Sequence, residues 1–363
     1  MKILQIINSL DTGGAEKLLL ETIPIYIEKG VEMDILVLNG KDYPFMTELK
    51  ELNCCKIYSL GFQSVYNPIH IFKIIPYLKK YDLIHVHLFP AQYWVVLAKL
   101  VSFSKSKLIF TEHNTSNRRL ESQLFSLIDK HFYRFYTAVI CITTEIKELL
   151  LNHTRLPLTR LHLIENGVNL INIINAKALK KEDINVSLKH TDKIIIQVSS
   201  FRPQKDQATL IRAMKLLPDN IKLFLIGDGL LRNDCEALVM KLYLQKRVLF
   251  LGLRIDVPQL LKTSDIVVLS SKYEGLSLSS IEGMASGKPF VASDVPGLSE
   301  IVKNAGVLFE CGDVKELADI IKELLDNPKY YSDVVLSCQA KAVGYGINRM
   351  IDSHILLYKS LLE

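Results

Sequence analysis

The stretch SSKYEGLSLSSIEGMASG, residues 270–287, carries the strongest structural signal in the chain. An apolar run, IVVL at 266–269, precedes it and is typical of a buried parallel strand. A helix is predicted to open near Ser277 and to close at Gly287, because glycine favours a C-terminal cap and Pro289 prevents the helix from continuing. A further apolar run at 290–292 predicts the next strand. The stretch therefore indicates a strand–loop–helix–strand unit.

The start of this helix predicts an anion-binding site. Residues 275–278 present backbone N–H groups at a helix N-terminus, which carries about half a positive charge and suits a phosphate. Glu274 lies in the loop, and Glu282 lies about a turn and a half into the helix. The two carboxylates suit a nucleotide-sugar, one contacting the sugar and the other the ribose hydroxyls. The alternative interpretation is a pair of solvated acids beside an ordinary strand-to-helix loop.

The segment EGLSLSSIE, 274–282, resembles the E-x7-E signature of family 4 retaining glycosyltransferases (glycosyl transferases group 1) with the GT-B fold. The GKP tripeptide at 287–289 fits the same pattern. The resemblance implies an α/β chain of two Rossmann-like domains that face each other across an interdomain cleft. It assigns Glu274 a catalytic role in holding sugar hydroxyls and Glu282 a role in binding the donor ribose. The donor diphosphate would meet the helix start at Gly275, Leu276, Ser277 and Leu278.

Chain length and composition agree with two globular domains. A chain of 363 residues exceeds one ordinary core. Its 49% hydrophobic and 23% charged residues exclude a disordered chain, and a net charge of +5 is too mild to favour nucleic acid. With the resemblance, we predict an N-terminal acceptor domain over 1–175 and a donor domain over 176–345. A C-terminal helix over 346–363 is expected to pack back on the first domain.

The first glycine-rich loop follows a predicted strand at 3–7 and precedes a predicted helix at 16–27, a Rossmann-like opening. The dinucleotide motif G-x-G-x-x-G does not occur there, so this loop is not a dinucleotide site. In the resembled family this loop lets the backbone approach the donor diphosphate while nearby side chains face the acceptor. We carry these roles to Gly14 and Glu16 respectively. The alternative is a tight turn in which glycine supplies a positive φ.

Two predicted strands end in polar residues, where ligands bind in open α/β sheets. The strand DLIHVH, 82–87, places His85 inside the strand as a core histidine and His87 at its end, as an acceptor-binding candidate. The strand LIFTEHN, 108–114, ends where family members present a histidine to the donor sugar, and this role falls on His113. Its neighbours Glu112 and Asn114 are acceptor-binding candidates.

The loop SSFRPQKD, 199–206, follows a predicted strand at 193–198 and resembles the family element G-R-L-x-x-x-K-G, whose Arg and Lys neutralise the donor diphosphate. Lys205 falls on the lysine position. Ser200 falls on the arginine position, so Arg202 is predicted to supply the guanidinium, which can bind phosphate bidentately as serine cannot. Arg254 follows a strand at 248–252, where the family meets the nucleobase, and is a further donor-binding candidate. The alternative for Arg202 and Lys205 is a pair of ordinary loop charges.

The sequence predicts a cytoplasmic protein. No window approaches 18–20 consecutive apolar residues, and the six cysteines lack metal-binding spacings and are typical of reduced thiols. The segment 99–134 holds seven basic and three acidic residues, with apolar residues interleaved in its second half. It suits either anionic lipid head groups at the inner face of the cell membrane or a core helix with a solvated basic face.

These features predict a hexosyltransferase that moves a sugar from a nucleotide-sugar, expected to be a UDP-sugar, to an acceptor hydroxyl with retention of configuration. The expected acceptor is a saccharide or lipid-linked saccharide of bacterial surface-polysaccharide synthesis, and neither cofactor nor metal is expected. Retaining glycosidases use two carboxyls about 5 Å apart, and nothing in the first domain identifies such a nucleophile. A front-face attack, with the leaving phosphate accepting the acceptor's proton, is therefore preferred. The alternatives are a nucleotide-sugar 2-epimerase of the same architecture and a non-catalytic nucleotide-sugar-binding protein.

Overall fold

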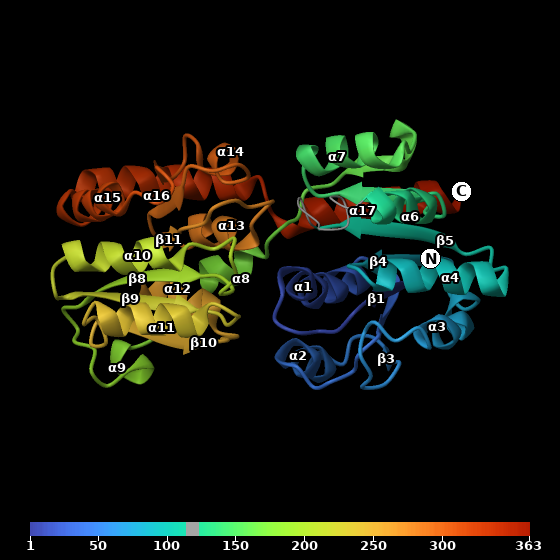
Figure 1. The fold of residues 1–363 in the computed structure, drawn as a ribbon, viewed down its shortest axis with the longest axis horizontal. Coiled ribbons are helices and arrows are strands. Elements are labelled where there is room, and N and C mark those ends of the chain that lie inside the picture. Colours follow the sequence, from blue (N-terminus) through green and yellow to red (C-terminus); the bar gives the residue numbers. More distant parts are fainter. Residues whose placement is uncertain (114–122) are drawn as a thin grey trace. The chain divides into compact units, whose positions relative to one another are not determined.

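The computed structural model describes residues 1–113 and 123–363 and divides the chain into two compact units (Figure 1). The first unit comprises Met1–Gly167 and Ile347–Glu363, and the second comprises Val168–Gly346. Each unit is built on its own parallel β-sheet. Because parallel strands need a crossover between them, helices alternate with strands along both units.

The sheet of the first unit has seven strands in the order β3-β2-β1-β4-β5-β6-β7. The strands are β1 (Lys2–Ile7), β2 (Glu32–Val37), β3 (Ile57–Ser59), β4 (Leu83–His87), β5 (Lys107–Glu112), β6 (Ala138–Cys141) and β7 (Leu161–Leu163). The helices of this unit are α1 (Gly14–Glu28), α2 (Pro44–Leu52), α3 (His70–Leu78), α4 (Ala91–Ser102), α6 (Gln123–Tyr133), α7 (Thr144–Thr154) and the C-terminal α17 (Ile347–Leu362). The strand order reverses between β1 and β4, which makes their C-terminal ends the expected ligand crevice.

The sheet of the second unit has six strands in the order β10-β9-β8-β11-β12-β13 and reverses between β8 and β11. The strands are β8 (Lys193–Val198), β9 (Ile221–Ile226), β10 (Val248–Gly252), β11 (Ile266–Leu269), β12 (Phe290–Ser293) and β13 (Val307–Phe309). The helices are α8 (Leu170–Asn175), α9 (Lys181–Ile184), α10 (Gln207–Ala213), α11 (Arg232–Lys241), α12 (Val257–Thr263), α13 (Leu278–Ala285), α14 (Ser299–Val302), α15 (Val314–Asp326) and α16 (Pro328–Val343).

Three segments differ from the sequence-based expectation. The apolar residues within 52–60 predict a strand over that range, but residues 57–59 alone form β3. Helix α2 extends to Leu52, with Pro44 in its first turn and Phe45, Met46 and Leu49 buried, and Asn53 ends it in the left-handed conformation. The segment 170–191 has few aromatic residues and predicts a linker into the second domain, but it contains the short helices α8 and α9. Helix α16 was not anticipated; Asn327 caps it by accepting from Tyr330 N–H at 3.1 Å, and Pro328 follows at its first position.

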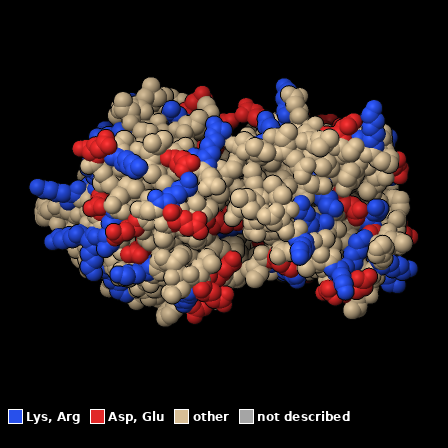
Figure 2. All heavy atoms as spheres, turned by 180° about the vertical axis from the view of Figure 1, so that it is seen from behind, with Lys and Arg blue, Asp and Glu red and all other residues tan. Residues whose placement is uncertain are grey.

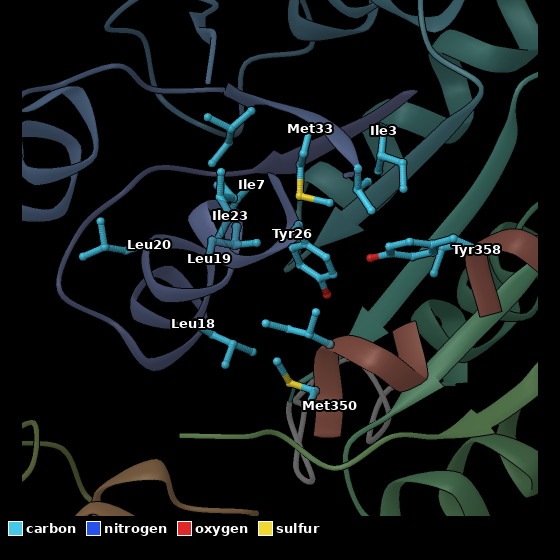
Figure 3. Close-up of a cluster of buried hydrophobic side chains, with 14 of the residues drawn as sticks. Ile3, Ile7, Leu18, Leu19, Leu20, Ile23, Tyr26, Met33, Met350 and Tyr358 are labelled. Carbon is cyan, nitrogen blue, oxygen red and sulfur yellow. The ribbon is translucent and has the colours of Figure 1, made fainter. Parts of the chain in front are cut away.

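The core of the first unit joins both ends of the chain. Helix α17 packs on α1, and their apolar side chains share a cluster with those of β1 and β2 (Figure 3). Met350 and Tyr358 of α17 lie in this cluster, and the hydroxyls of Tyr358 and Tyr26 point towards each other in Figure 3. Burying these side chains removes α17 from solvent along a whole face, which is why the last helix belongs to the first unit.

Four polar side chains of the first unit's sheet lie on the face that α1 and α17 cover. Parallel register aligns Gln5 with His85 and His87 with Thr111, so alternation along β1, β4 and β5 directs all four to one face. His85 is buried and satisfied: its Nδ1 bonds the Tyr358 hydroxyl and its Nε2 the Thr111 hydroxyl, both at 2.7 Å. Burial, with the neighbouring His354 and His113, lowers its pKa well below the ordinary range. His85 is thus an uncharged structural histidine.

His354 on α17 extends this buried group. Its Nδ1 bonds the Tyr26 hydroxyl, and its ring packs edge-on against His85. Burial lowers the pKa of His354 from 6.5 to about 3, with a smaller contribution from His113. A folded chain with a neutral His354 therefore binds fewer protons in weak acid than the unfolded chain does.

Replacing His354 with Gln should reduce the acid sensitivity of the fold. Below about pH 6.5 the unfolded chain protonates this histidine while the folded chain does not, so the free energy of unfolding falls as pH falls, by about 2 kcal/mol at pH ~5 for one such group. Denaturant unfolding of wild type and His354→Gln at pH ~7.5 and ~5 measures the difference, with exposed His190→Gln as the control. An equal acid loss in wild type and His354→Gln would contradict the assignment.

Candidate functional site

Three loops meet at the C-terminal edge of the second sheet. They follow β8 (residues 199–206), β11 (270–277) and β12 (294–298), three strands that are neighbours in the sheet. The first two loops flank the point where the strand order reverses, the usual ligand position in open α/β sheets. The sequence-predicted donor residues in these loops are therefore brought to one edge.

The start of α13 presents unpaired backbone donors. Ser277 is the N-cap but its side chain does not cap the helix; its hydroxyl bonds that of Ser279 at 3.0 Å. Among the described residues no hydrogen bond uses the N–H groups of residues 275–278. Open N–H groups and the helix dipole together favour an anion at this point.

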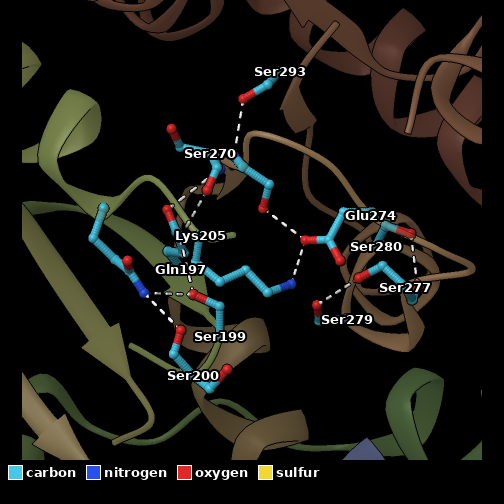
Figure 4. A network of polar contacts seen from close by, with 12 residues as sticks. Gln197, Ser199, Ser200, Lys205, Ser270, Glu274, Ser277, Ser279, Ser280 and Ser293 are labelled. Atoms are coloured by element: carbon cyan, nitrogen blue, oxygen red, sulfur yellow. Dashed lines mark hydrogen bonds and ion pairs between the residues drawn. The ribbon is translucent and has the colours of Figure 1, made fainter. Parts of the chain in front are cut away.

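Lys205 and Glu274 form an ion pair across this edge (Figure 4). Lys205 Nζ donates to Glu274 Oε1, which also accepts from the Ser271 hydroxyl at 2.6 Å. The side chains are only 15% and 10% exposed, so the pair lies largely out of solvent. Within the described part of the chain, no hydrogen bond reaches Glu274 Oε2. The pair thus leaves one carboxylate oxygen and two ammonium protons for a ligand.

The loop after β12 fixes the position of Glu274. Glu274 N–H donates to the Pro296 carbonyl at 3.2 Å. Gly297 has φ +82°, and a Cβ at this position would lie 2.1 Å from the Glu274 carbonyl oxygen. Only glycine permits this approach, since an added methyl group would meet backbone atoms. Gly297 therefore belongs to the support of the site.

Other cations at this edge differ in availability. Arg202 is exposed, and within the described residues its guanidinium makes no hydrogen bond or ion pair. Arg254 is already engaged by Asp256, at 2.7 and 2.5 Å, and this contact raises the pKa of Arg254 and lowers that of Asp256. Ser200 contributes its carbonyl to the Gln207 side-chain amide at 3.0 Å. Arg202 is thus the free guanidinium nearest in sequence to the position that Ser200 occupies.

Glu282 lies on α13, about a turn and a half after the N-cap Ser277, and is 5% exposed. The helix packs closely on the sheet at the next residue: a Cβ on Gly283 would lie 2.6 Å from the Phe290 ring. This close packing fixes the helix axis, and with it the positions of the N-terminal amides and of Glu282.

The first unit brings a second group of predicted residues to its own sheet edge. Helix α1 begins at Gly14, and the carboxylate of Glu16 folds back on the helix start. It lies so close to Gly13 that a Cβ on that residue would be 2.2 Å from Glu16 Oε2. A carboxylate is stabilised at a helix N-terminus. The Glu16 carboxylate therefore lies beside this glycine loop.

His87 and His113 are in contact at this edge. His87 Nδ1 lies 3.1 Å from His113 Nε2, and His87 Nε2 lies 2.8 Å from Gln5 Oε1. His87 is 3% exposed, and both of its ring nitrogens already have hydrogen-bond partners. It therefore supports His113 and has no ring nitrogen left to contact an acceptor sugar. Burial lowers the pKa of His113 to about 4.

Two neighbouring predictions have different outcomes. Glu112 is buried and accepts from the Tyr133 hydroxyl at 2.6 Å, so its carboxylate is part of the β5–α6 packing. Asn114 lies outside the described residues. Sequence reasoning had assigned no role to Gln5, Ser271 or Gly297; the available signals were a glutamine inside a buried strand and the glycine of DVPGLSE at 294–300.

Comparisons with known proteins agree with the fold and identify the family. The family model for glycosyl transferases group 1 matches residues 180–336, and the model for glycosyltransferase family 4 matches residues 12–171. An uncharacterized glycosyltransferase of Methanocaldococcus jannaschii is 30% identical over 279 residues, covering 74% of this chain and 72% of the relative. The Escherichia coli UDP-Gal:alpha-D-GlcNAc-diphosphoundecaprenol alpha-1,3-galactosyltransferase is 27% identical over 309 residues, covering 80% and 78%.

A solved structure identifies the architecture. Anabaena HepE in complex with UDP-glucose superposes with a TM-score of 0.83 at 23% identity, covering 99% of this chain and 100% of that one. The two parallel sheets therefore define the class, a GT-B fold of two Rossmann-like domains. Within this class the chain belongs to glycosyltransferase family 4, the glycosyl transferases group 1, and the resemblance drawn from EGLSLSSIE is confirmed.

Gly297→Ala should impair glycosyl transfer more than its effect on stability explains. Its methyl group must displace the Glu274 backbone, and a displacement of about 1 Å at a reacting group can cost ~100-fold in rate. Gly312→Ala is the matched control, because its φ is +88° but no atom lies within 4 Å of the added Cβ. In thermal unfolding, both variants should lose the stability that a non-glycine residue costs at a positive φ, and Gly297→Ala should lose more because its methyl group also meets backbone atoms. Equal kcat/KM values for the two variants would show that Gly297 does not position Glu274.

Proposed function

We propose that this glycosyltransferase moves a hexose from a UDP-sugar to a hydroxyl of a lipid-linked saccharide, with retention of configuration. The observation that carries the proposal is the Lys205–Glu274 pair beside the open amides of α13. UDP is supported by the name of the Escherichia coli relative and by the UDP-glucose complex of Anabaena HepE. The acceptor class is supported by the same relative, which acts on a GlcNAc-diphosphoundecaprenol.

Charge develops mainly on the leaving diphosphate. As the bond between the anomeric carbon and the diphosphate oxygen breaks, negative charge grows on UDP and positive charge on the sugar ring. Lys205, Arg202 and the amides at 275–278 would stabilise the leaving group, and such preorganised donors commonly contribute ~100-fold or more in rate. Because protein groups supply this positive charge, we propose a metal-independent reaction.

The carboxylates and His113 would act on the sugar and ribose. Glu274 Oε2 would hold sugar hydroxyls and lie beside the positive ring, while Glu282 would accept from ribose hydroxyls. The acceptor oxygen attacks the face that the diphosphate leaves, and its proton passes to the leaving phosphate oxygen. His113 would meet a further sugar hydroxyl. In this scheme Gly14 admits the diphosphate to the first glycine loop, Glu16 contacts the acceptor and Arg254 borders the nucleotide.

A surface of the first unit has the character of a membrane-docking face. The packed helices α3 and α4 expose apolar side chains at Phe72 (64%) and Val101 (52%), and Phe103 after α4 is 91% exposed. Lys79 and Lys80 directly follow α3, Lys105 follows α4, and all three are exposed. Figure 2 shows basic and acidic residues interspersed over one face of the protein, with Lys and Arg side chains frequent towards its left-hand end.

We propose that this surface docks on anionic lipid. No helix in residues 1–113 and 123–363 has the length and apolar character needed to cross a bilayer. Apolar insertion combined with basic contacts is the usual way in which a protein lies on a membrane. The proposed surface lies on α3, α4 and the following turn, whereas the described remainder of the 99–134 segment includes the buried Asp129 and Tyr133.

Glu274→Gln should lower kcat about 100-fold or more while thermal protection by UDP is retained, since the amide keeps the shape but loses the charge. Glu282→Gln should raise the donor KM roughly 10-fold with kcat little changed. The assay uses UDP-glucose and UDP-galactose with a GlcNAc-diphospholipid acceptor, with and without chelator, and NMR of the product linkage. The exposed Glu310→Gln is the control.

Several outcomes would refute this assignment. Full turnover by Glu274→Gln would remove its catalytic role, and an inverted linkage would exclude retention. Conversion of the donor to an epimer when no acceptor is present would favour the epimerase. UDP-sugar binding without turnover under any of these conditions would favour a non-catalytic binding protein.

Phe72→Ser and Phe103→Ser should each weaken binding to vesicles that contain anionic lipid by about 10-fold or more, because each removes about 2 kcal/mol of apolar insertion. The matched control is Leu336→Ser, an exposed leucine on α16 of the second unit. Vesicle flotation with anionic and with neutral lipid measures binding. Equal flotation of the three variants and the wild type would contradict this docking surface.

A further inference from the structure

The contact between His87 and His113 poses a question of proton placement. Each neutral imidazole carries one N–H and one lone pair, so a bond between two rings requires one to donate and the other to accept. The rings lie 3.1 Å apart, from His87 Nδ1 to His113 Nε2. Burial holds the pKa of both histidines below the ordinary range, so both are neutral near pH 7. The direction of this hydrogen bond is therefore fixed by whatever lies behind His87.

Gln5 lies behind His87 and has a defined orientation. Its amide nitrogen faces the Met33 sulfur at 3.5 Å, and its oxygen faces His87 Nε2 at 2.8 Å. Burial raises the pKa of the Tyr358 hydroxyl, and hydrogen bonds with Tyr26 and Gln5 partly offset this rise. The contribution of Gln5 is the one expected when its amide N–H is directed to that hydroxyl. The amide oxygen can only accept, so His87 must carry its proton on Nε2.

The consequence passes through His87 to His113. With its proton on Nε2, neutral His87 has a lone pair on Nδ1, and His113 must donate to it from Nε2. His113 then has a lone pair on Nδ1. Among the described residues no hydrogen bond reaches that atom, and the His113 side chain is partly exposed whereas His87 is buried. The ring therefore offers an acceptor, not a donor, at the sheet edge.

We propose that Gln5 and His87 are positioning residues that hold His113 in its Nε2–H tautomer, so that His113 Nδ1 accepts a hydrogen bond from a hydroxyl of the bound sugar. This inference rests on the proposed function for the identity of the ligand, but the tautomer itself does not depend on any substrate. Three side chains from β1, β4 and the end of β5 act as one directional chain. A ligand atom that can only accept would meet a lone pair at this point.

The hydrogen bonds that link Gln5, His87 and His113 are separate from those of the structural histidine His85. His85 uses Tyr358 and Thr111 as partners and makes no hydrogen bond to His113 within the described chain. Removing the Thr111 hydroxyl should therefore alter His85 alone. Without the Gln5 oxygen, the proton of neutral His87 is no longer held on Nε2. The proton of His113 is then no longer held on its own Nε2 either. This contrast provides a matched control for a positioning role.

The direct test is the tautomer of His113 in the ligand-free full-length protein. Long-range ¹H–¹⁵N NMR of histidine-labelled protein near neutral pH distinguishes protonated from unprotonated ring nitrogens, and His113→Gln assigns the signal among nine histidines. We expect the proton of His113 on Nε2 in the wild type. A proton on Nδ1 would overturn the proposal without any variant having to fold.

Two substitutions of Gln5 should change the tautomer in different ways. Gln5→Met removes the acceptor and should give a mixture of the two His113 tautomers. Gln5→Glu places a carboxylate against His87, which should draw a second proton onto that ring; His87 Nδ1 then donates, and the proton of His113 moves to Nδ1. Thr111→Val should leave the His113 tautomer unchanged. An unchanged tautomer in folded Gln5→Met would overturn the proposal.

Kinetics separates this proposal from the proposed function. If UDP-glucose or UDP-galactose is a donor, Gln5→Met should raise the donor KM by roughly 2- to 10-fold, the effect of one neutral hydrogen bond, with a smaller change in kcat. A shifted tautomer with an unchanged KM would overturn the role of Nδ1 as the acceptor for a sugar hydroxyl. Absence of glycosyl transfer would refute the proposed function, while the NMR result would still decide the tautomer.

Discussion

The candidate site of the second unit depends on one ion pair, between Lys205 after β8 and Glu274 after β11. The pair joins the two loops that flank the point at which the strand order reverses, and it is largely removed from solvent. Taking two charges out of water is costly unless they are paired, so each residue offsets the burial of the other. Ser271 and the loop at Gly297 complete the support by fixing the carboxylate and its backbone.

The two units provide polar groups of different kinds. The second offers charge: the ammonium of Lys205, the exposed guanidinium of Arg202 and the amides of a helix start. The first offers neutral histidines, because burial lowers the pKa of His85, His87, His113 and His354 and so disfavours a second proton on each ring. A charge acts at a distance, whereas a neutral imidazole recognises a ligand only through the direction of its hydrogen bonds. The second unit is therefore suited to a diphosphate and the first to hydroxyl groups.

Much of the fold could be predicted because parallel strands are continuous apolar runs. IVVL at 266–269 and the strand at 193–198 are examples, and both form as expected. Helix α2 was missed because its apolar residues follow polar turn residues and run directly into the segment taken for a strand. Ser277, predicted to open α13, is its N-cap. The candidate donor residues were proposed from motif spacing, but the supporting roles of Ser271 and Gly297 were not, because these roles are contacts with Glu274 that only the folded loops create.

The sequence by itself determined the class of this protein: the E-x7-E segment, the loop with Lys205 and the alternation of strands with helices are local patterns. Only the tertiary structure decided which residues act together. Lys205 and Glu274 are 69 residues apart, and Gln5 and His87 are 82 apart, yet each pair is in hydrogen-bond contact. Strand order brings them together, and strand order is set by how the sheets bury their apolar faces, a property of the whole chain that no local pattern contains.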